Sequence, residues 1–208
     1  MVFHLFQFLK VTDSNFDWEK HYSEEESLHE IYSERVYLIF LAKNEKFRAK
    51  VKVVGKVNAR LFKKIKSLFP KNQPDDIAYL LSSLAHIHEK LVGVYSFLKE
   101  FNTIEKIHEE FELQGAMEFR DAFSSKTTFL VAQIESFKTE LKTAIPFFRK
   151  SQEVFNPDKL IHELLNLEID LSNLEKDLSG QINKIIKTTN EYYFAEKEHE
   201  KRRRDTNH

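Results

Sequence analysis

Three Glu-x-x-His pairs are the residues of this sequence whose types and spacing could hold a metal ion. Residues three apart on a helix share one face, so each pair could direct a carboxylate and an imidazole to the same point. Di-iron helical bundles use two such pairs together with carboxylates from two other helices. A metal-binding four-helix bundle is therefore one hypothesis for this chain. The three pairs are Glu26/His29, Glu105/His108 and Glu196/His199.

The surroundings of these pairs favour a simpler explanation. All three fall near the expected ends of helices, and two lie in highly charged, solvent-facing stretches. We therefore prefer a polar cluster that closes one end of a bundle, and we predict no cofactor. The sequence also lacks cysteine, a phosphate-binding loop, a dinucleotide-binding turn and a nucleophile elbow. No catalytic residue is predicted, and a non-enzymatic role is favoured.

A strongly basic segment is the second feature that could bind something. Residues 43–71 carry eleven basic side chains and one acid, Glu45. These cations could pair with acids on neighbouring helices or on a protein partner, or they could bind an anionic membrane or nucleic acid. We favour pairing of these cations with acids of neighbouring helices or of a protein partner. Surfaces that bind nucleic acid often place aromatic residues among the cations, whereas Phe47, Phe62 and Phe69 fall at core-like positions. The candidate anion-binding residues are Lys43, Lys46, Arg48, Lys50, Lys52, Lys56, Arg60, Lys63, Lys64 and Lys66.

The elements that position these side chains are expected to be long helices. Only 4 Gly and 4 Pro occur in 208 residues, too few for the turns of a sheet protein. The strong breakers lie at Pro70 and Pro74, at Gly115 and at Asn156-Pro157. They divide the chain into predicted helices at about 24–69, 75–113, 116–154 and 157–200. Asn102-Thr103 is a candidate short break, and Pro146 should kink or interrupt the third helix.

Apolar residues repeat along these segments with a mean spacing of 3.5 residues, which is typical of a coiled-coil seam. Short connections between segments of similar length favour antiparallel neighbours. We therefore predict an all-α protein, an elongated up-down antiparallel four-helix bundle with coiled-coil-like seams. The clearest seam is Leu160, Leu164, Leu167, Leu171, Leu174 and Leu178.

Residues 36–54 leave an α+β alternative open. Basic and apolar residues alternate from Lys46 to Val53, as in a half-buried strand. The apolar run Val36–Ala42 could pair with it as a β-hairpin. The helical interpretation instead places Phe47, Val51 and Val54 on one stripe, and a lone hairpin without further strands is only marginally stable. We prefer the helix.

The two ends of the sequence differ from the predicted bundle at 23–200. Residues 1–22 form an apolar N-terminal segment that could fold back on the bundle end, contact a second copy of the chain, or lie at a membrane surface. Residues 201–208 form a basic tail. No apolar run approaches the ~18 residues needed to cross a bilayer, so we expect a cytoplasmic protein, with a membrane-peripheral location as the alternative.

These observations favour a structural or protein-interaction bundle, a scaffold whose partner is another protein or a second copy of itself. The first alternative is a peripheral binder of an anionic membrane or nucleic acid through residues 43–66, and the second is a metal-binding bundle. No small-molecule substrate is predicted.

Overall fold

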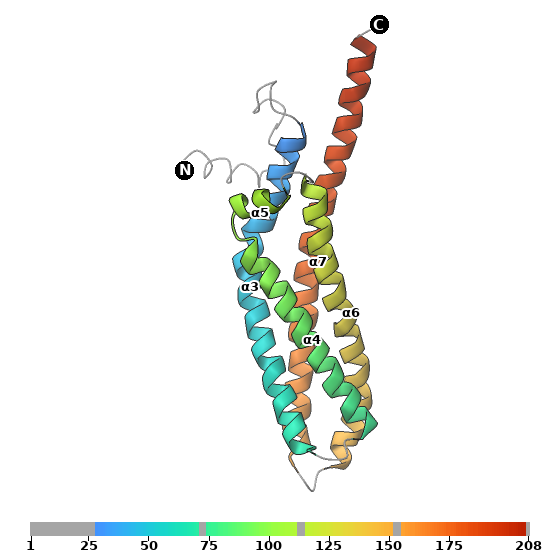
Figure 1. Ribbon diagram of the computed structural model, residues 1–208. Coiled ribbons are helices and arrows are strands. Elements are labelled where there is room, and N and C mark those ends of the chain that lie inside the picture. Colours follow the sequence, from blue (N-terminus) through green and yellow to red (C-terminus); the bar gives the residue numbers. More distant parts are fainter. Residues whose placement is uncertain (1–27, 71–73, 112–114, 152–154, 207–208) are drawn as a thin grey trace. The chain divides into compact units, whose positions relative to one another are not determined.

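Every described element of the protein is a helix (Figure 1). The computed structural model describes residues 28–70, 74–111, 115–151 and 155–206, without the side chains at 28–30, 199–200 and 203–206. The predicted all-α class is confirmed. The helices are α3 (Leu28–Leu68), α4 (Asp75–Glu100), α5 (Ile104–Phe111), α6 (Gly115–Lys150) and α7 (Pro157–Thr206).

The β-hairpin alternative at residues 36–54 is wrong, because this whole range lies inside α3. Phe47, Val51 and Val54 are buried on one helical stripe, whereas Val53, which would share a strand face with Val51, is 59% exposed. Burial of apolar side chains along a 3.6-residue period outweighs the local preference of Val for strands. Gly55 is also accommodated within the helix despite its lower helix propensity.

Side-chain caps explain where two of the helices begin. The predicted helix at 75–113 is divided into α4 and α5, and Thr103 lies in the gap between them. Its Oγ1 accepts a hydrogen bond of 3.3 Å from the backbone N of Lys106. Asn156 caps α7 in the same way, since its Oδ1 accepts a 3.3 Å bond from the backbone N of Lys159. Both bonds satisfy amide groups that have no partner inside a helix.

Pro146 was predicted to kink or interrupt its helix, and the predicted interruption is wrong. The helix continues through it to Lys150. Pro146 is exposed near the C-terminal end, so few later backbone bonds depend on it. Leu141, Ala144 and Phe148 are almost fully buried on either side, and this packing holds the last turns of the helix in place.

The chain forms two compact units, to which α3, α6 and α7 each contribute a part. Unit 1 contains the described residues 28–44, 101–111, 115–122 and 180–206. Unit 2 contains the described residues 45–70, 74–100, 123–151 and 155–179.

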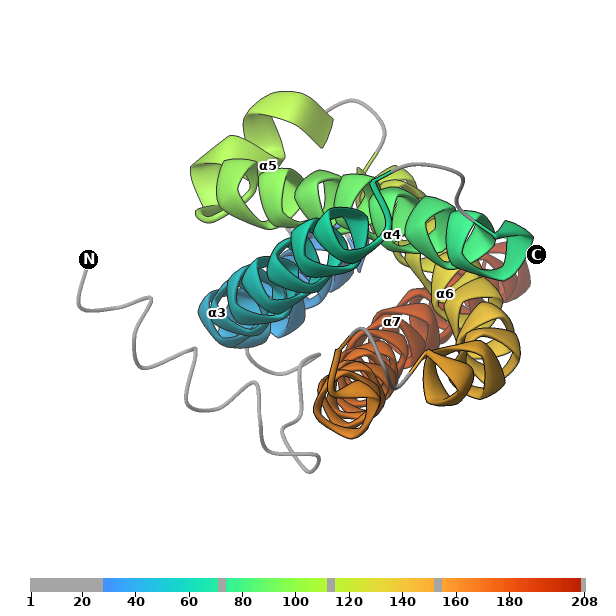
Figure 2. The same cartoon turned by 90° about the horizontal axis from the view of Figure 1, so that it is seen from below.

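Unit 2 is a four-helix bundle built from α3, α4, α6 and α7 around one core (Figure 2). Residue numbers rise along α3 from Lys50 to Lys64 while those of the partners on α7 fall from Asp177 to Glu163. Helix α4 also runs in the direction opposite to α3 (Figure 1), so both neighbours are antiparallel to α3, as predicted. The seam leucines of α7 are at most 1% exposed, which confirms the apolar repeat seen in the sequence. The contacts between successive helices are Asn58–Leu84, Phe97–Phe123, Lys138–Glu175 and Lys64–Glu163.

Unit 1 is organised around Phe119 of α6, which is completely buried. The rings of Phe40, Phe111 and Tyr37 surround it with centroid distances of 4.9, 5.3 and 5.5 Å, all edge-to-face. This geometry suits the quadrupoles of aromatic rings. The short helix α5 therefore packs onto α6 through Phe111.

Several predictions at the two ends lie outside the described residues. They include the apolar segment 1–22 and the first turn of the helix predicted from residue 24. At the other end, α7 continues to Thr206 and so includes most of the segment predicted as a basic tail. Among the described helices, none is both long and apolar enough to cross a membrane.

Candidate functional site

The Glu-x-x-His pairs do not gather into a metal site in the described part of the chain. Glu105 and His108 are exposed on α5, and Glu196 is exposed on α7. Glu26 and the side chains of His29 and His199 lie outside the description. Across the described ranges, no group of three or more His, Asp or Glu side chains could hold a metal ion.

His108 has a structural contact. Its ring stands edge-on to Tyr37 of α3, with a centroid distance of 5.1 Å. Tyr37 is 2% exposed, so the imidazole covers one side of a buried tyrosine at the surface of unit 1. Such an aromatic contact helps to dock α5 onto α3.

The basic residues of α3 separate into two rows on different faces of the helix. The row toward α7 pairs with acids of that helix within unit 2. Lys50 donates to Asp177, and Lys64 donates to Glu163 at 3.2 Å. Arg60 also approaches Glu163, at 3.9 Å. The predicted pairing of these cations with neighbouring helices is therefore present for part of the segment.

The second row, toward α4, remains available to solvent. Its members are four, seven or three residues apart, so they share one face of α3. All but Arg48 are exposed, and within the described ranges none of the five forms an ion pair with an acid of the protein. We call them the α4-side row: Arg48, Lys52, Lys56, Lys63 and Lys66. Lys43 and Lys46, the two other candidate cations, are also exposed.

An apolar groove of about 310 Å³ lies beside this row, between α3 and α4 of unit 2. Val51, Leu91, Val92 and Tyr95 supply its apolar lining, and Val92 is 51% exposed. Covering this exposed valine with an apolar group of a partner would remove apolar surface from water, which is favourable. Its remaining lining residues are Lys52, Gly55, Lys56, Ala59 and His88.

Gly55 gives the groove its depth on the α3 side. A Cβ atom at this position would meet no other heavy atom within 4 Å. The space that a larger side chain would fill is therefore open. Ala59, one turn later, extends the shallow wall with its single methyl group. Lys52 and Lys56 border this open wall, so apolar and cationic groups are available to one ligand.

A second groove of about 400 Å³ lies on the opposite side of α3, against α7. It contains Lys50 and Val53 from α3, and Asp170 and Asn173 from α7. Lys50 already pairs with Asp177 of α7. Cations and acids are mixed in this groove, so it offers less attraction to an anionic ligand than the α3–α4 groove.

The sequence identified the lysines of the α3–α4 groove but not its α4 wall. Val92 and Tyr95 were not predicted as site residues because they lie off the apolar seam of α4. An apolar Val outside the seam was the available signal. Whether such a valine lines a groove depends on which helix lies beside α4, and a single sequence does not show which helices are neighbours.

Comparison of the chain with protein-family models, curated proteins and solved structures finds no match.

Proposed function

We propose that this protein is a non-enzymatic interaction bundle whose α3–α4 groove binds an acidic, amphipathic helix of a partner protein. The observation that carries the proposal is the combination of an apolar lining with bordering lysines that have no ion-pair acid among the described residues. A partner helix would place its apolar stripe against Val92 and Tyr95, and its carboxylates near Lys52 and Lys56. The proposal keeps the cytoplasmic location that the composition favours.

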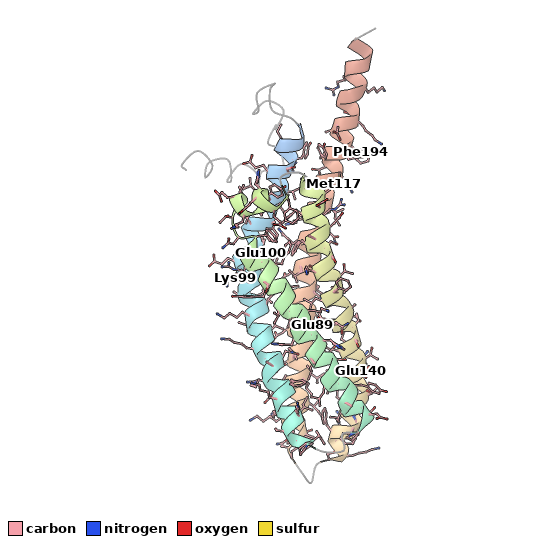
Figure 3. The ribbon with its side chains drawn as sticks, viewed as in Figure 1. Glu89, Lys99, Glu100, Met117, Glu140 and Phe194 are labelled. Atoms are coloured by element: carbon pink, nitrogen blue, oxygen red, sulfur yellow. The ribbon has the colours of Figure 1, made fainter. Side chains whose placement is uncertain are left out.

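A protein helix suits this surface better than nucleic acid or lipid does. Phosphates would neutralise the lysines but would leave the half-exposed side chain of Val92 in water. Helix α4 also exposes Glu100 next to Lys99, and Glu89 farther along the helix, where it pairs with Lys90 (Figure 3). Carboxylates on the same helix would repel a continuous phosphate backbone, whereas a partner helix can carry both signs of charge.

The proposal can be tested with a designed peptide. The probe is a fluorescent helical peptide with leucines at positions i, i+3, i+4 and i+7 and glutamates on its other faces, and the comparison is a scrambled peptide of identical composition. Fluorescence anisotropy should show saturable binding of the amphipathic peptide only, weakening as salt rises.

Two variants address the two halves of the groove. Reversing both charges with Lys52→Glu and Lys56→Glu should weaken binding about tenfold or more, because a close interfacial charge pair contributes roughly 1.5 kcal/mol or more. Gly55→Leu fills the apolar wall and should also weaken binding. The matched control is Lys126→Glu with Lys142→Glu, two exposed lysines of α6 in unit 2, which should leave the affinity unchanged.

Parallel measurements separate the competing interpretations. Single-stranded DNA and phosphatidylserine vesicles are titrated in the same buffer. The helix-binding proposal fails if the DNA or the vesicles bind more tightly than the peptide and their affinity is unchanged by Gly55→Leu. In that case the α3 lysines bind an anionic surface. A protein mass that rises with concentration in light scattering would instead identify a second copy as the partner.

A further inference from the structure

A small pocket in unit 1 combines aromatic rings with a carboxylate. It has a volume of about 200 Å³ and lies between the unit 1 parts of α3, α6 and α7. This is smaller than the ~300–1,000 Å³ of pockets for drug-sized ligands, so only a small group would fit. The pocket, called the tyrosine pocket below, is lined among others by Tyr32, Met117, Thr189, Tyr192, Tyr193 and Glu196.

The rings come from two helices. Tyr32 of α3 and Tyr192 of α7 stand 5.7 Å apart between centroids, at an interplanar angle of 51°. Because the two rings are tilted, one ligand in the pocket could contact the face of one ring and the edge of the other. Met117 of α6 adds a thioether on another side, and it is 37% exposed (Figure 3).

One of the rings already holds a cation. The Nζ atom of Lys197 lies over the ring of Tyr193, 4.4 Å from its centroid. An ammonium group is attracted to the negative face of an aromatic ring, most strongly when it is removed from water. Lys197 therefore occupies one face of the Tyr193 ring, and a ligand cation would compete with it for that face.

The carboxylate of Glu196 adds a negative charge to the pocket. Burial, and then the hydrogen bond and charge of Glu196, raise the pKa of Tyr192 to about 12. The hydrogen bond with Glu196 keeps the Tyr192 hydroxyl beside that carboxylate in the pocket. One carboxylate beside three aromatic rings is a suitable environment for a single positive charge.

We propose that the tyrosine pocket binds a small alkylated ammonium ion, such as the trimethylammonium group of a choline-type molecule. The rings of Tyr32, Tyr192 and Tyr193 would contact the methyl groups, and Glu196 would balance the charge. An anionic ligand would be repelled by Glu196. A purely apolar ligand would gain nothing from that carboxylate. The pocket lies in unit 1, so this proposal is independent of the α3–α4 groove of unit 2.

The test uses the full chain and a matched pair of ligands. Choline and its uncharged carbon analogue 3,3-dimethylbutanol have the same shape and differ in the central atom and its charge. Isothermal titration calorimetry should show saturable choline binding, with the neutral analogue about threefold to thirtyfold weaker, the range that cation–π contacts span.

Variants then assign the site. Glu196→Gln should weaken choline binding about twofold to fivefold, as expected for an exposed charge. Lys197→Met should strengthen it, because a competing ammonium group is removed. Tyr192→Leu should weaken it, whereas the control Tyr79→Leu should not. Tyr79 is a 60% exposed tyrosine on α4 in unit 2.

Three results would overturn the proposal. One is the absence of saturable choline binding, and another is equal affinity for the neutral analogue. The third is an equal loss of affinity in Tyr79→Leu and Tyr192→Leu, since this would place the binding elsewhere. Circular dichroism of each variant confirms that the helices remain formed, and Glu196→Gln probes the pocket without removing an aromatic ring.

Discussion

Replacing Gly55 and Gly115 by alanine should change the stability of the protein in opposite directions. Gly55 lies inside α3, and a Cβ there would meet no heavy atom within 4 Å. Gly115 begins α6 with a φ of 69°, in the left-handed region. The same added methyl group therefore meets a permissive backbone at one position and an unfavourable one at the other.

The expected magnitudes follow from these two environments. Alanine is about 0.8–1.0 kcal/mol more favourable than glycine in a helix interior, so Gly55→Ala should raise the free energy of unfolding by roughly that amount. A non-glycine residue in the left-handed conformation costs about 1–2 kcal/mol, so Gly115→Ala should lower it. The two variants should therefore differ by roughly 2–3 kcal/mol.

Urea unfolding followed by far-ultraviolet circular dichroism measures both changes. With a slope of about 1–3 kcal/mol per molar urea, a change of one kcal/mol moves the midpoint by roughly 0.3–1 M. Gly55 belongs to unit 2 and Gly115 to unit 1. Amide hydrogen exchange in α3 and α6 would show whether each change affects its own unit. Gly93→Ala serves as a replicate, because a Cβ there also meets nothing within 4 Å.

The outcome for Gly55 also bears on the α3–α4 groove. If Gly55→Ala lowers the stability, the added methyl group meets a neighbour, and the open wall of the groove does not exist in solution. The groove would then lose the space into which a partner helix is proposed to bind. If Gly115→Ala leaves the stability unchanged, the left-handed backbone at the start of α6 is refuted.

Two further predictions concern unit 1. Phe119→Ala should lower the free energy of unfolding by about 3–5 kcal/mol, because it removes a completely buried ring from an aromatic cluster. The exposed control Phe129→Ala should cost less than about 0.5 kcal/mol, and a loss below about 2 kcal/mol for Phe119→Ala would contradict the packing described. Burial raises the pKa of Tyr37 from 10.0 to about 12. Between these pH values the unfolded chain loses a proton that the folded protein keeps, so the free energy of unfolding should fall as the pH rises. Urea titrations across this window should show a shallower decline for Tyr37→Phe, and identical slopes would refute the assignment.

Much of the helix pattern was predictable because it depends on local chemistry. The scarcity of Gly and Pro, the seam from Leu160 to Leu178 and the cap at Asn156 each act within a few turns of the chain. The predicted interruption at Pro146 was wrong, because the cost of a proline depends on where the helix ends and on the packing of its neighbours. The residues from Lys46 to Val53 left two interpretations open, because they fit both the two-residue period of a strand and the helical period of 3.6 residues.

The candidate sites were less predictable. The sequence showed that residues 43–71 are unusually basic, but not which cations face acids of α7. The tyrosine pocket brings residues of α3 together with residues of α7 that lie far away in the sequence, and no short motif marks it. The Glu-x-x-His pairs, the most conspicuous pattern, produced no metal cluster among the described residues.

The sequence by itself determined that this chain folds as helices, because hydrophobic period and helix capping are properties of neighbouring residues. Tertiary structure alone decided which lysines of α3 are neutralised and which border an apolar groove. Ion pairs and pockets form between residues whose distance apart depends on the register of one helix against another. That register results from the simultaneous packing of all the buried side chains, and no segment of the sequence contains it.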